Sequence, residues 1–216
     1  MSILDGLVDK PGTLAVGGFT NDGKLVDFRS TENVTSDLGA MASQFAATIA
    51  MLMGTFGASF SELTRLEMVP FYGWMYTGGD MSSVIQGNRW AILRTADSQL
   101  RVPDPPADPT LDSLLAMPGV RFAAYYSPDG NEIAHTQSLA FDRALHRTVT
   151  EIVASGTATF RGLATAFTHL TKTKWTPPKV WVYSGGDWTI AASDCCWVLG
   201  EAGEAEITDL HRALAR

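Results

Sequence analysis

The sequence predicts two tandem copies of one α/β domain, each an α+β sandwich in which helices pack on a sheet. Three observations support this fold class. Short motifs recur at a fixed offset, strand and helix patterns follow the same order in each half, and a proline-rich stretch separates the halves. A chain of 216 residues has room for two small domains of this kind.

The repeat has an offset of 107 residues, as from Leu4 to Leu111, and does not slip between residues 4 and 90. Several recurring positions carry uncommon residue types, which chance does not explain. They are Pro11-Gly12 with Pro118-Gly119, Asp22-Gly23 with Asp129-Gly130, Trp74 with Trp181, Tyr76 with Tyr183, and Trp90 with Trp197. We therefore predict a first copy at residues 1–96, a stiff linker at 97–109 and a second copy at 110–216.

Each copy begins with a short helical pattern, at residues 3–8 and 111–117, that a Pro-Gly pair ends. A long helix is predicted at 35–66, because apolar residues recur there every three or four positions. Its counterpart in the second copy carries an apolar stripe from Leu145 to Leu170. The strands of the first copy are predicted at residues 13–20, 24–29, 69–77, 81–86 and 89–95.

The second copy repeats the last three strands, at residues 180–184, 188–192 and 195–199, and ends with a helix at 204–214. In the first copy, the positions equivalent to this closing helix fall in the proline-rich linker. We therefore expect that helix to be absent or shortened in the first copy, which would leave one face of its sheet open.

The segment 38–61 carries no charged residue and is long enough to span a bilayer. Its counterpart, however, carries Arg147, Glu151 and Arg161, and a charge at bilayer depth costs about 2.5–3.5 kcal/mol. Because duplicated elements should be placed alike, we predict a protein-buried helix and no membrane insertion. Its many glycines and alanines predict a close approach by the long helix of the other copy, on the side that the sheet does not cover.

The composition indicates which kinds of partner and which cellular compartment to expect. The formal net charge is −7 and no cluster of Lys and Arg stands out, so we expect no nucleic-acid binding. The first residues lack the basic start of a signal peptide, and two adjacent cysteines cannot form a disulfide framework. These features favour a cytoplasmic protein.

The element order, the Leu-Asp-x-Leu…Pro-Gly opening, the Asp-Gly turn and the Trp…Gly-Gly-Asp stretch resemble the roadblock / dynein-light-chain family, closest to an uncharacterised prokaryotic branch. The resemblance covers the chain except residues 97–109 and implies a profilin-like fold. Family members dimerise by pairing their long helices and middle strands, which implies an intramolecular pseudo-dimer here. Their usual roles are scaffolding and regulation. The resemblance also links the prokaryotic branch to genes for heterodisulfide-reductase-like sulfur oxidation.

The common sequence motifs of enzymes are absent. The chain has no phosphate-binding G-x-x-x-x-G-K-[ST], no dinucleotide-binding G-x-G-x-x-G, no G-x-S-x-G and no H-E-x-x-H. We therefore predict a non-catalytic protein without a cofactor or a metal. The leading hypothesis is a scaffold or regulatory subunit that binds another protein, and a further homo-oligomer is left open. The residues expected to pair the two copies are Phe45, Ile49, Phe56, Ile152 and Phe160.

Three other groups of residues have both a functional and a structural interpretation. The two Gly-Gly-Asp turns could bind an anion through backbone N–H groups, but hairpin turns explain them better; they are Gly78, Gly79, Asp80, Gly185, Gly186 and Asp187. Cys195 and Cys196 could be a redox site, yet ordinary packing is favoured, with one thiol facing the core and the other facing out. The aromatic residues Trp74, Tyr76, Trp181 and Tyr183 could form a recognition surface, although core packing is favoured.

The four histidines show no spacing typical of a zinc site, and the only helical pair within range is His146 with Asp142. We expect ordinary surface histidines. Two alternatives to the scaffold remain: a small-ligand sensor with a pocket shaped by glycines, and a thiol or redox accessory protein that uses Cys195 and Cys196.

Overall fold

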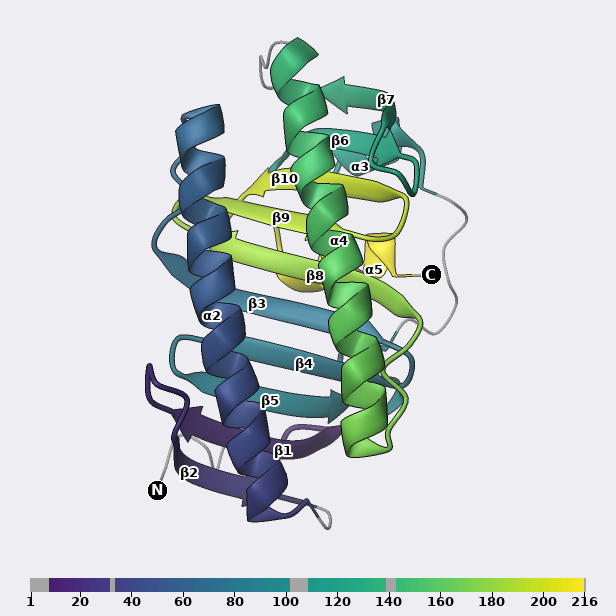
Figure 1. Cartoon of the computed structure of the whole chain (residues 1–216). Coiled ribbons are helices and arrows are strands. Elements are labelled where there is room, and N and C mark those ends of the chain that lie inside the picture. Colours follow the sequence, from purple (N-terminus) through teal and green to yellow (C-terminus); the bar gives the residue numbers. More distant parts are fainter. Residues whose placement is uncertain (1–7, 32–33, 102–108, 139–142, 216) are drawn as a thin grey trace.

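A single antiparallel sheet of ten strands runs through both halves of the chain in the computed structural model, which describes residues 8–31, 34–101, 109–138 and 143–215 (Figure 1). The strand order is β2-β1-β5-β4-β3-β8-β9-β10-β6-β7. The two long helices, α2 and α4, lie side by side and antiparallel across one face. The short helices α3 and α5 lie on the opposite face.

The elements follow the same order in each half of the chain. In the first copy they are β1 (Thr13–Phe19), β2 (Leu25–Ser30), α2 (Ser36–Thr64), β3 (Phe71–Gly78), β4 (Met81–Gln86), β5 (Arg89–Arg94) and the 3-10 turn η1 (Thr95–Asp97). In the second copy they are α3 (Leu111–Leu115), β6 (Val120–Tyr126), β7 (Glu132–Gln137), α4 (Arg143–Thr171), β8 (Pro178–Gly185), β9 (Trp188–Ala192), β10 (Cys196–Glu201) and α5 (Ile207–Leu214).

The two copies join where β3 pairs with β8, which we call the seam. The strands are antiparallel there, and Trp74 is paired with Tyr183 while Tyr76 is paired with Trp181. A pseudo-twofold axis therefore interchanges these two pairs, and the equivalent residues Met75 and Val182 lie opposite one another between them. The mixed α/β class expected for the chain is confirmed, and the strands of both copies form one continuous sheet.

The ends of α2 follow from local sequence. The hydroxyl of Thr35 accepts a hydrogen bond from the N–H of Leu38 and so caps the first turn. The helix ends at Arg65, which adopts a left-handed conformation with φ of 64°. This helix is also long and apolar enough to cross a bilayer by length and composition, although in the structure it lies along the sheet.

The main hydrophobic core lies between the sheet and the two long helices. Its largest members include the aromatic residues that recur in the two copies: Trp74, Tyr76, Trp90, Trp181, Tyr183 and Trp197. All are at most 4% exposed, so the prediction that the strand aromatics form core is confirmed. A second core, which includes Leu114 and Leu210, lies beneath α3 and α5 on the opposite face.

Two expectations about the long helices are wrong. The outer side of α2 is not covered by α4, because both helices rest on the sheet and turn their outer sides to solvent; Met51 on α2 is 66% exposed. Nor do the glycines mark a helix–helix contact. Gly54 and Gly162 face open space, whereas Gly57 lies directly against the ring of Tyr183.

Two predicted terminal helices concern residues that are only partly described. The opening helix expected at residues 3–8 lies almost wholly outside the described residues. A closing helix of the first copy, equivalent to α5, would occupy residues 100–107, of which 102–107 are also outside. The described Leu100 and Arg101 do not belong to a helix.

Candidate functional site

Two tyrosine hydroxyl groups cross the seam at equivalent positions. Tyr76 donates to the carbonyl oxygen of Trp175 at 3.0 Å, and Tyr183 donates to the carbonyl oxygen of Met68. Burial raises the pKa of Tyr183 to about 12, so this hydroxyl keeps its proton. Each bond pairs a buried polar atom of one copy with a donor of the other, which fixes the copies relative to each other.

The Gly-Gly-Asp turns also belong to the seam. Gly78, Gly79 and Asp80 form the hairpin turn between β3 and β4, and Gly185, Gly186 and Asp187 form the turn between β8 and β9. Four of their N–H groups donate across the seam: Gly79 to Pro177 (2.9 Å), Asp80 to Lys174 (2.9 Å), Gly186 to Pro70 (2.9 Å) and Asp187 to Glu67 (2.8 Å). These N–H groups already donate to carbonyl oxygens, so an anion could bind them only by displacing these hydrogen bonds.

Three of the five residues predicted to pair the copies contact aromatic rings of the other copy. Phe45 lies 4.2 Å from Phe167, Phe56 lies 5.6 Å from Tyr183, and Phe160 lies 5.3 Å from Trp74, all between ring centroids. The other two are placed differently. Ile49 is fully buried in the main core. Ile152 is half-buried, and it is not among the described residues that form the main core cluster.

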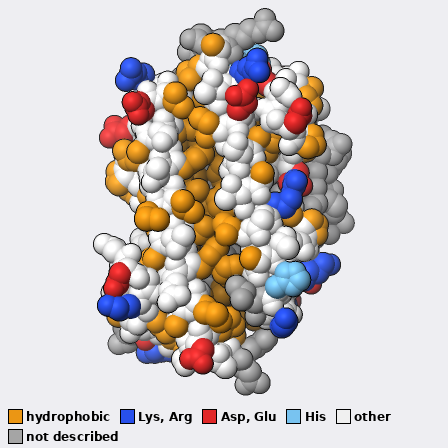
Figure 2. Space-filling view, in the orientation of Figure 1, with side chains coloured by type: hydrophobic (Ala, Val, Ile, Leu, Met, Phe, Trp, Pro, Cys, Tyr) orange, Lys and Arg blue, Asp and Glu red, His pale blue; other side chains and the backbone are white. Residues whose placement is uncertain are grey.

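An apolar furrow runs between α2 and α4 on the outer face of the molecule (Figure 2). It has a volume of about 390 Å³, and its walls include Leu38, Phe45, Leu163 and Phe167. The furrow therefore presents side chains of both copies to solvent.

The outer side of α2 continues this apolar surface. Met41, Met51 and Leu52 are 44%, 66% and 42% exposed. At the equivalent positions α4 carries Thr148, Ala158 and Thr159. We call Met41, Met51 and Leu52 the α2 patch. The two copies thus have the same backbone but differ in the chemistry of their outer helical surface.

Two further hollows bear on the ligand-sensor hypothesis. One, among Phe45, Trp74 and Phe160, has a volume of about 20 Å³, which is room for a single water molecule. The other is a groove of about 490 Å³ on the opposite face of the sheet, between the first copy and α5. Tyr72 and Ile207 are among its walls. Of these two hollows, only the groove has the size of a small-molecule site, a size that the furrow between α2 and α4 also reaches, so a ligand sensor could use either.

Cys196 is the first residue of β10 and Cys195 immediately precedes it, and both thiols are free. Cys195 is exposed and Cys196 is fully buried, as the alternation of a strand predicts. Both sulfur atoms nevertheless lie near the Ser193 hydroxyl, at 4.0 Å and 3.3 Å. Hydrogen bonds from Cys196 and then from Ser193 lower the pKa of Cys195 to about 6. The pKa of Cys196 is raised, by its hydrogen bond with Cys195 and by burial.

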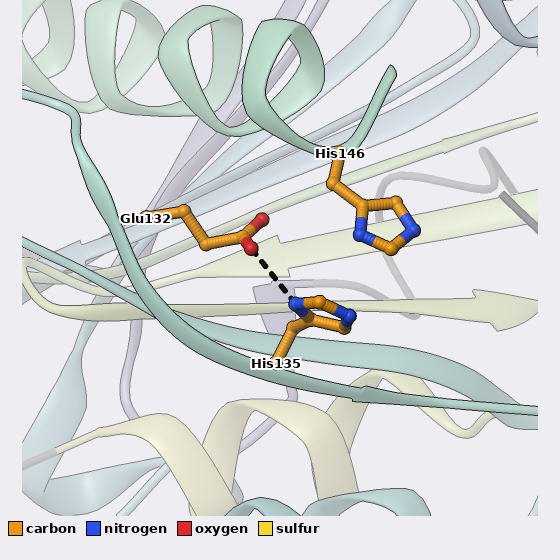
Figure 3. Close-up of side chains that lie close together, drawn as sticks. All are labelled: Glu132, His135 and His146. Atoms are coloured by element: carbon orange, nitrogen blue, oxygen red, sulfur yellow. Dashed lines mark hydrogen bonds and ion pairs between the residues drawn. The ribbon is translucent and has the colours of Figure 1, made fainter. Parts of the chain in front are cut away.

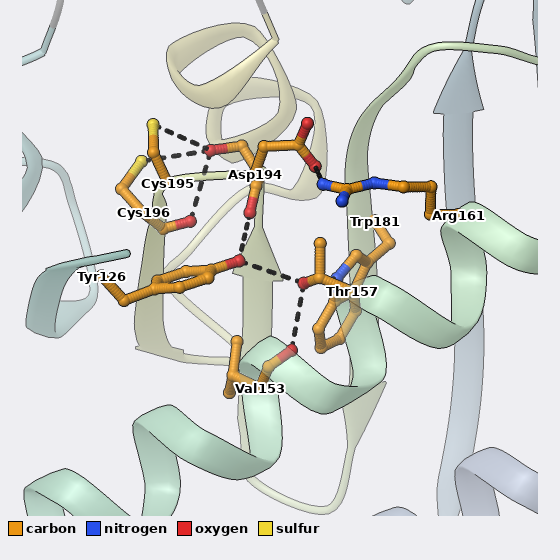
Figure 4. Close-up of polar contacts among 9 residues, drawn as sticks. Tyr126, Val153, Thr157, Arg161, Trp181, Asp194, Cys195 and Cys196 are labelled. Carbon is orange, nitrogen blue, oxygen red and sulfur yellow. Dashed lines mark hydrogen bonds and ion pairs between the residues drawn. The ribbon is translucent and has the colours of Figure 1, made fainter. Parts of the chain in front are cut away.

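The residues beneath the cysteines form a hydrogen-bonded network that reaches α4 (Figure 4). Tyr126 donates to the carbonyl oxygen of Ser193 and lies 3.1 Å from the Thr157 hydroxyl. Thr157 in turn accepts from the indole of Trp181 at 2.8 Å. Arg161 on α4 pairs with Asp194 at 3.0 Å, which holds the segment just before the cysteines to the helix.

The expectation of surface histidines is wrong for two of the four. His169 is exposed, but His146 and His211 are only 3% and 1% exposed. His211 on α5 lies 3.0 Å from the Thr77 hydroxyl on β3, so it too joins the copies. Burial, and then the charges of Arg212 and Lys179, lower its pKa from 6.5 to about 4. The proposed partner of His146, Asp142, lies outside the described residues.

Within the part of the chain that the structure describes, one group of ligand-type side chains lies together: Glu132 and His135 on β7 and His146 on α4 (Figure 3). One ligand atom of each lies within 4.8 Å of the others. Glu132 and His135 would point to opposite sides of a regular strand, being three positions apart. A β-bulge that leaves Ile133 without a partner on β6 brings both to the side of α4.

The sequence did not predict this cluster, because the regular alternation of a strand places Glu132 and His135 on opposite faces and does not reveal a bulge. A comparison of the copies could have found it. The equivalent residues of the first copy are Leu25, Phe28 and Gly39, so all three positions change from apolar or glycine to ligand types.

Comparison with known proteins places the whole chain in one family. A family model described as "Uncharacterized conserved protein (DUF2173)" matches twice, at residues 3–101 and 110–216. The two matches agree with a tandem duplication. No curated protein and no solved structure matches the sequence.

Proposed function

The chain belongs to the DUF2173 family in both of its halves, and from that premise we propose that it is a non-catalytic scaffold or regulatory subunit that binds another protein. We also propose the profilin-like roadblock fold for each copy. The order of two strands, long helix and three strands, with the helix across a five-stranded half-sheet, supports this proposal.

The observation that carries the proposed function is the α2 patch. Large apolar side chains that remain exposed lose free energy of burial, about 25 cal/mol per Å² of apolar area. The same fold positions carry small or hydroxylated residues on α4, so the fold does not require Met41, Met51 and Leu52 to be apolar. Met41 lines the furrow, and Met51 and Leu52 are exposed farther along the same helix. Large apolar residues gathered on one exposed helix beside a furrow favour a protein-interaction surface. The partner is therefore a protein that presents an apolar surface to α2.

A protein surface fits the α2 patch better than a lipid surface. Helices that lie in a membrane interface carry Lys and Arg on their polar side, where they attract anionic lipids. Between Ser36 and Thr64, α2 contains no Lys or Arg and two acidic residues, Asp37 and Glu62. The whole chain carries a net charge of −7, which an anionic membrane repels.

The test is capture of the partner from cells of the source organism, measured by quantitative mass spectrometry, with a matched pair of variants. Met51→Glu with Leu52→Glu places two charges in the α2 patch, whereas Ala158→Glu with Thr159→Glu makes the same change at the equivalent positions of α4. We expect the first variant to weaken binding of a stoichiometric partner on the order of 30-fold or more. The second variant should bind as wild type.

A partner that binds both variants equally would contradict the assignment to α2. A chain that elutes alone at its monomer mass from a native lysate would contradict the scaffold itself. Self-association that Met51→Glu with Leu52→Glu abolishes would instead identify a second copy of the chain as the occupant. Light scattering of the purified protein distinguishes that outcome.

A second candidate function, a thiol accessory protein, is favoured by one observation: Cys195 is exposed and its pKa is lowered to about 6. Its thiolate could attack a disulfide, forming a mixed disulfide and releasing one thiolate. Incubation with oxidised glutathione should then give one adduct on the folded wild-type chain and none on Cys195→Ser. Absence of any adduct on the wild type would exclude this function.

A further inference from the structure

The clustering of Glu132, His135 and His146 is specific to the second copy. In the first copy the same three positions form an apolar contact. A Cβ atom on Gly39 would lie 2.8 Å from the ring of Phe28 and 3.4 Å from Leu25. The side chains at the first two positions therefore fill the space that the His146 side chain occupies in the second copy.

This comparison shows that the fold itself does not need polar groups there. Both copies have the same β-bulge, which leaves Val26 and Ile133 as the unpaired and exposed residues. Both also hold the bulged strand beside the start of the long helix. Apolar side chains fill this space without the desolvation cost of buried polar groups, as the first copy shows. The fold therefore does not explain why the second copy has Glu132, His135 and His146 at these positions, and ligand binding would explain it.

The carboxylate is held by bonds that would orient a metal ligand. Glu132 Oε1 lies 2.8 Å from His135 Nδ1, and Oε2 accepts from the Thr150 hydroxyl at 3.4 Å. Thr150 itself accepts from the indole N–H of Trp197 at 3.2 Å. The chain from Trp197 through Thr150 to Glu132 has the form of the outer bonds that fix metal-binding carboxylates.

The two imidazoles are fixed by packing. The ring of Phe122 stacks on His135 at 5.8 Å with an interplanar angle of 7°, and it meets the edge of His146 at 5.3 Å. His135 and His146 lie 4.2 Å apart, measured between ring centroids. The side chain of His135 remains 32% exposed and that of Glu132 17% exposed, so the cluster is open to solvent on one side.

We propose that Glu132, His135 and His146 bind a divalent transition-metal ion, with zinc as the ion that fits the ligand set best. Two imidazole nitrogens and one carboxylate oxygen form a common three-ligand zinc set, and the fourth, solvent-facing position is open to water or to a group from a partner. Ligand atoms on one tetrahedral zinc lie about 3.3 Å apart, given bonds of about 2.0 Å. The present spread is up to 4.8 Å, so zinc binding requires the part-exposed side chains of Glu132 and His135 to move toward the buried His146.

The experiment titrates zinc chloride into the full-length chain, purified and dialysed free of chelator, with stoichiometry by elemental analysis and affinity by competition with a chromogenic chelator. We expect one zinc per chain and a raised Tm on zinc binding. Glu132→Gln and His135→Ala should each lower the zinc affinity by about 100-fold or more, since even outer bonds contribute about 10–100-fold. Both variants alter part-exposed side chains, and their Tm in chelator should match the wild type in chelator.

Two control variants separate this site from other zinc ligands on the chain. His169→Ala removes an exposed histidine on the last turn of α4, and Cys195→Ser removes the exposed thiol; both should bind zinc as wild type. X-ray absorption of the zinc-loaded wild type should show nitrogen and oxygen ligands only, including two imidazoles. This last measurement does not depend on how any variant folds.

Three results would overturn the proposal. They are the absence of zinc binding at micromolar zinc, binding that Glu132→Gln and His135→Ala leave unchanged, and a sulfur ligand in the X-ray absorption spectrum. The last would place the ion on the cysteines.

Discussion

Replacing Gly57 by alanine tests how α2 lies across the seam. Gly57 is in the middle of α2 in the first copy, yet its Cα faces the hydroxyl end of Tyr183 on β8 of the second copy. A Cβ atom built there overlaps the Tyr183 hydroxyl and lies 2.8 Å from the ring carbon that bears it and 3.1 Å from the Met68 carbonyl oxygen. Tyr183 is 0% exposed, so its ring has little room to retreat.

The magnitude follows from two opposing effects. Alanine stabilises a helix interior by about 1 kcal/mol relative to glycine. Against this, loss of the bond from Tyr183 to the carbonyl oxygen of Met68 leaves buried polar groups unpaired, which costs about 1–3 kcal/mol, and overpacking costs about 1–3 kcal/mol more. We therefore expect Gly57→Ala to lower the free energy of unfolding by about 1–5 kcal/mol.

The same helix supplies the control. Gly54 lies one turn earlier on α2, and a Cβ atom there would meet nothing within 4 Å. Gly54→Ala should therefore raise the free energy of unfolding by up to about 1 kcal/mol. The assay is urea unfolding of the full-length chain, followed by circular dichroism and by tryptophan fluorescence. If Gly57→Ala stabilised the chain as much as Gly54→Ala, the packing of α2 on the other copy would be refuted.

Three further predictions concern single residues. His211 stays neutral in the folded state, with a pKa of about 4, but takes up a proton near pH 6.5 when unfolded. Stability is therefore full above pH 6.5 and falls toward pH 4 by about 3 kcal/mol; in urea unfolding at pH 7.5 and 4.5, His211→Gln should lose that much less, and an equal loss would contradict the assignment. Cys195 should react with iodoacetamide with a midpoint near pH 6 while buried Cys196 stays unmodified, and a midpoint at the ordinary thiol value would contradict the lowered pKa. Phe160→Ala should cost about 3–5 kcal/mol of unfolding free energy, because its ring lies between Trp74 and Trp181; a cost below about 1 kcal/mol would contradict that packing.

Much of the fold was predictable because the sequence repeats itself. The recurrence of Trp74 as Trp181 and of Tyr76 as Tyr183 indicated two copies, and period-two alternation placed those residues on one buried face of the sheet. The long helices were predictable from their apolar period, although that period does not reveal which apolar residues a neighbour covers. Met51 fits the composition of a buried helix and is nonetheless exposed.

The candidate sites were less predictable, because each depends on geometry that a sequence pattern does not contain. A bulge at Ile133 places Glu132 and His135 on the same side, against the alternation of a regular strand. The seam uses the N–H groups of Gly79 and Gly186, which sequence alone could assign to a turn or to an anion. Both cases need the register between strands, which is set by tertiary packing.

Hydrogen–deuterium exchange of the full-length chain tests most directly the claim that the two copies act as one body. In the structure β3 and β8 are the two central strands of the sheet, each bonded on both sides. We expect peptides covering Phe71–Gly78 and Pro178–Gly185 to exchange only through global unfolding, as slowly as those covering β5 and β10. If either strand exchanged as fast as the edge strands β2 and β7, the two copies would not share one sheet.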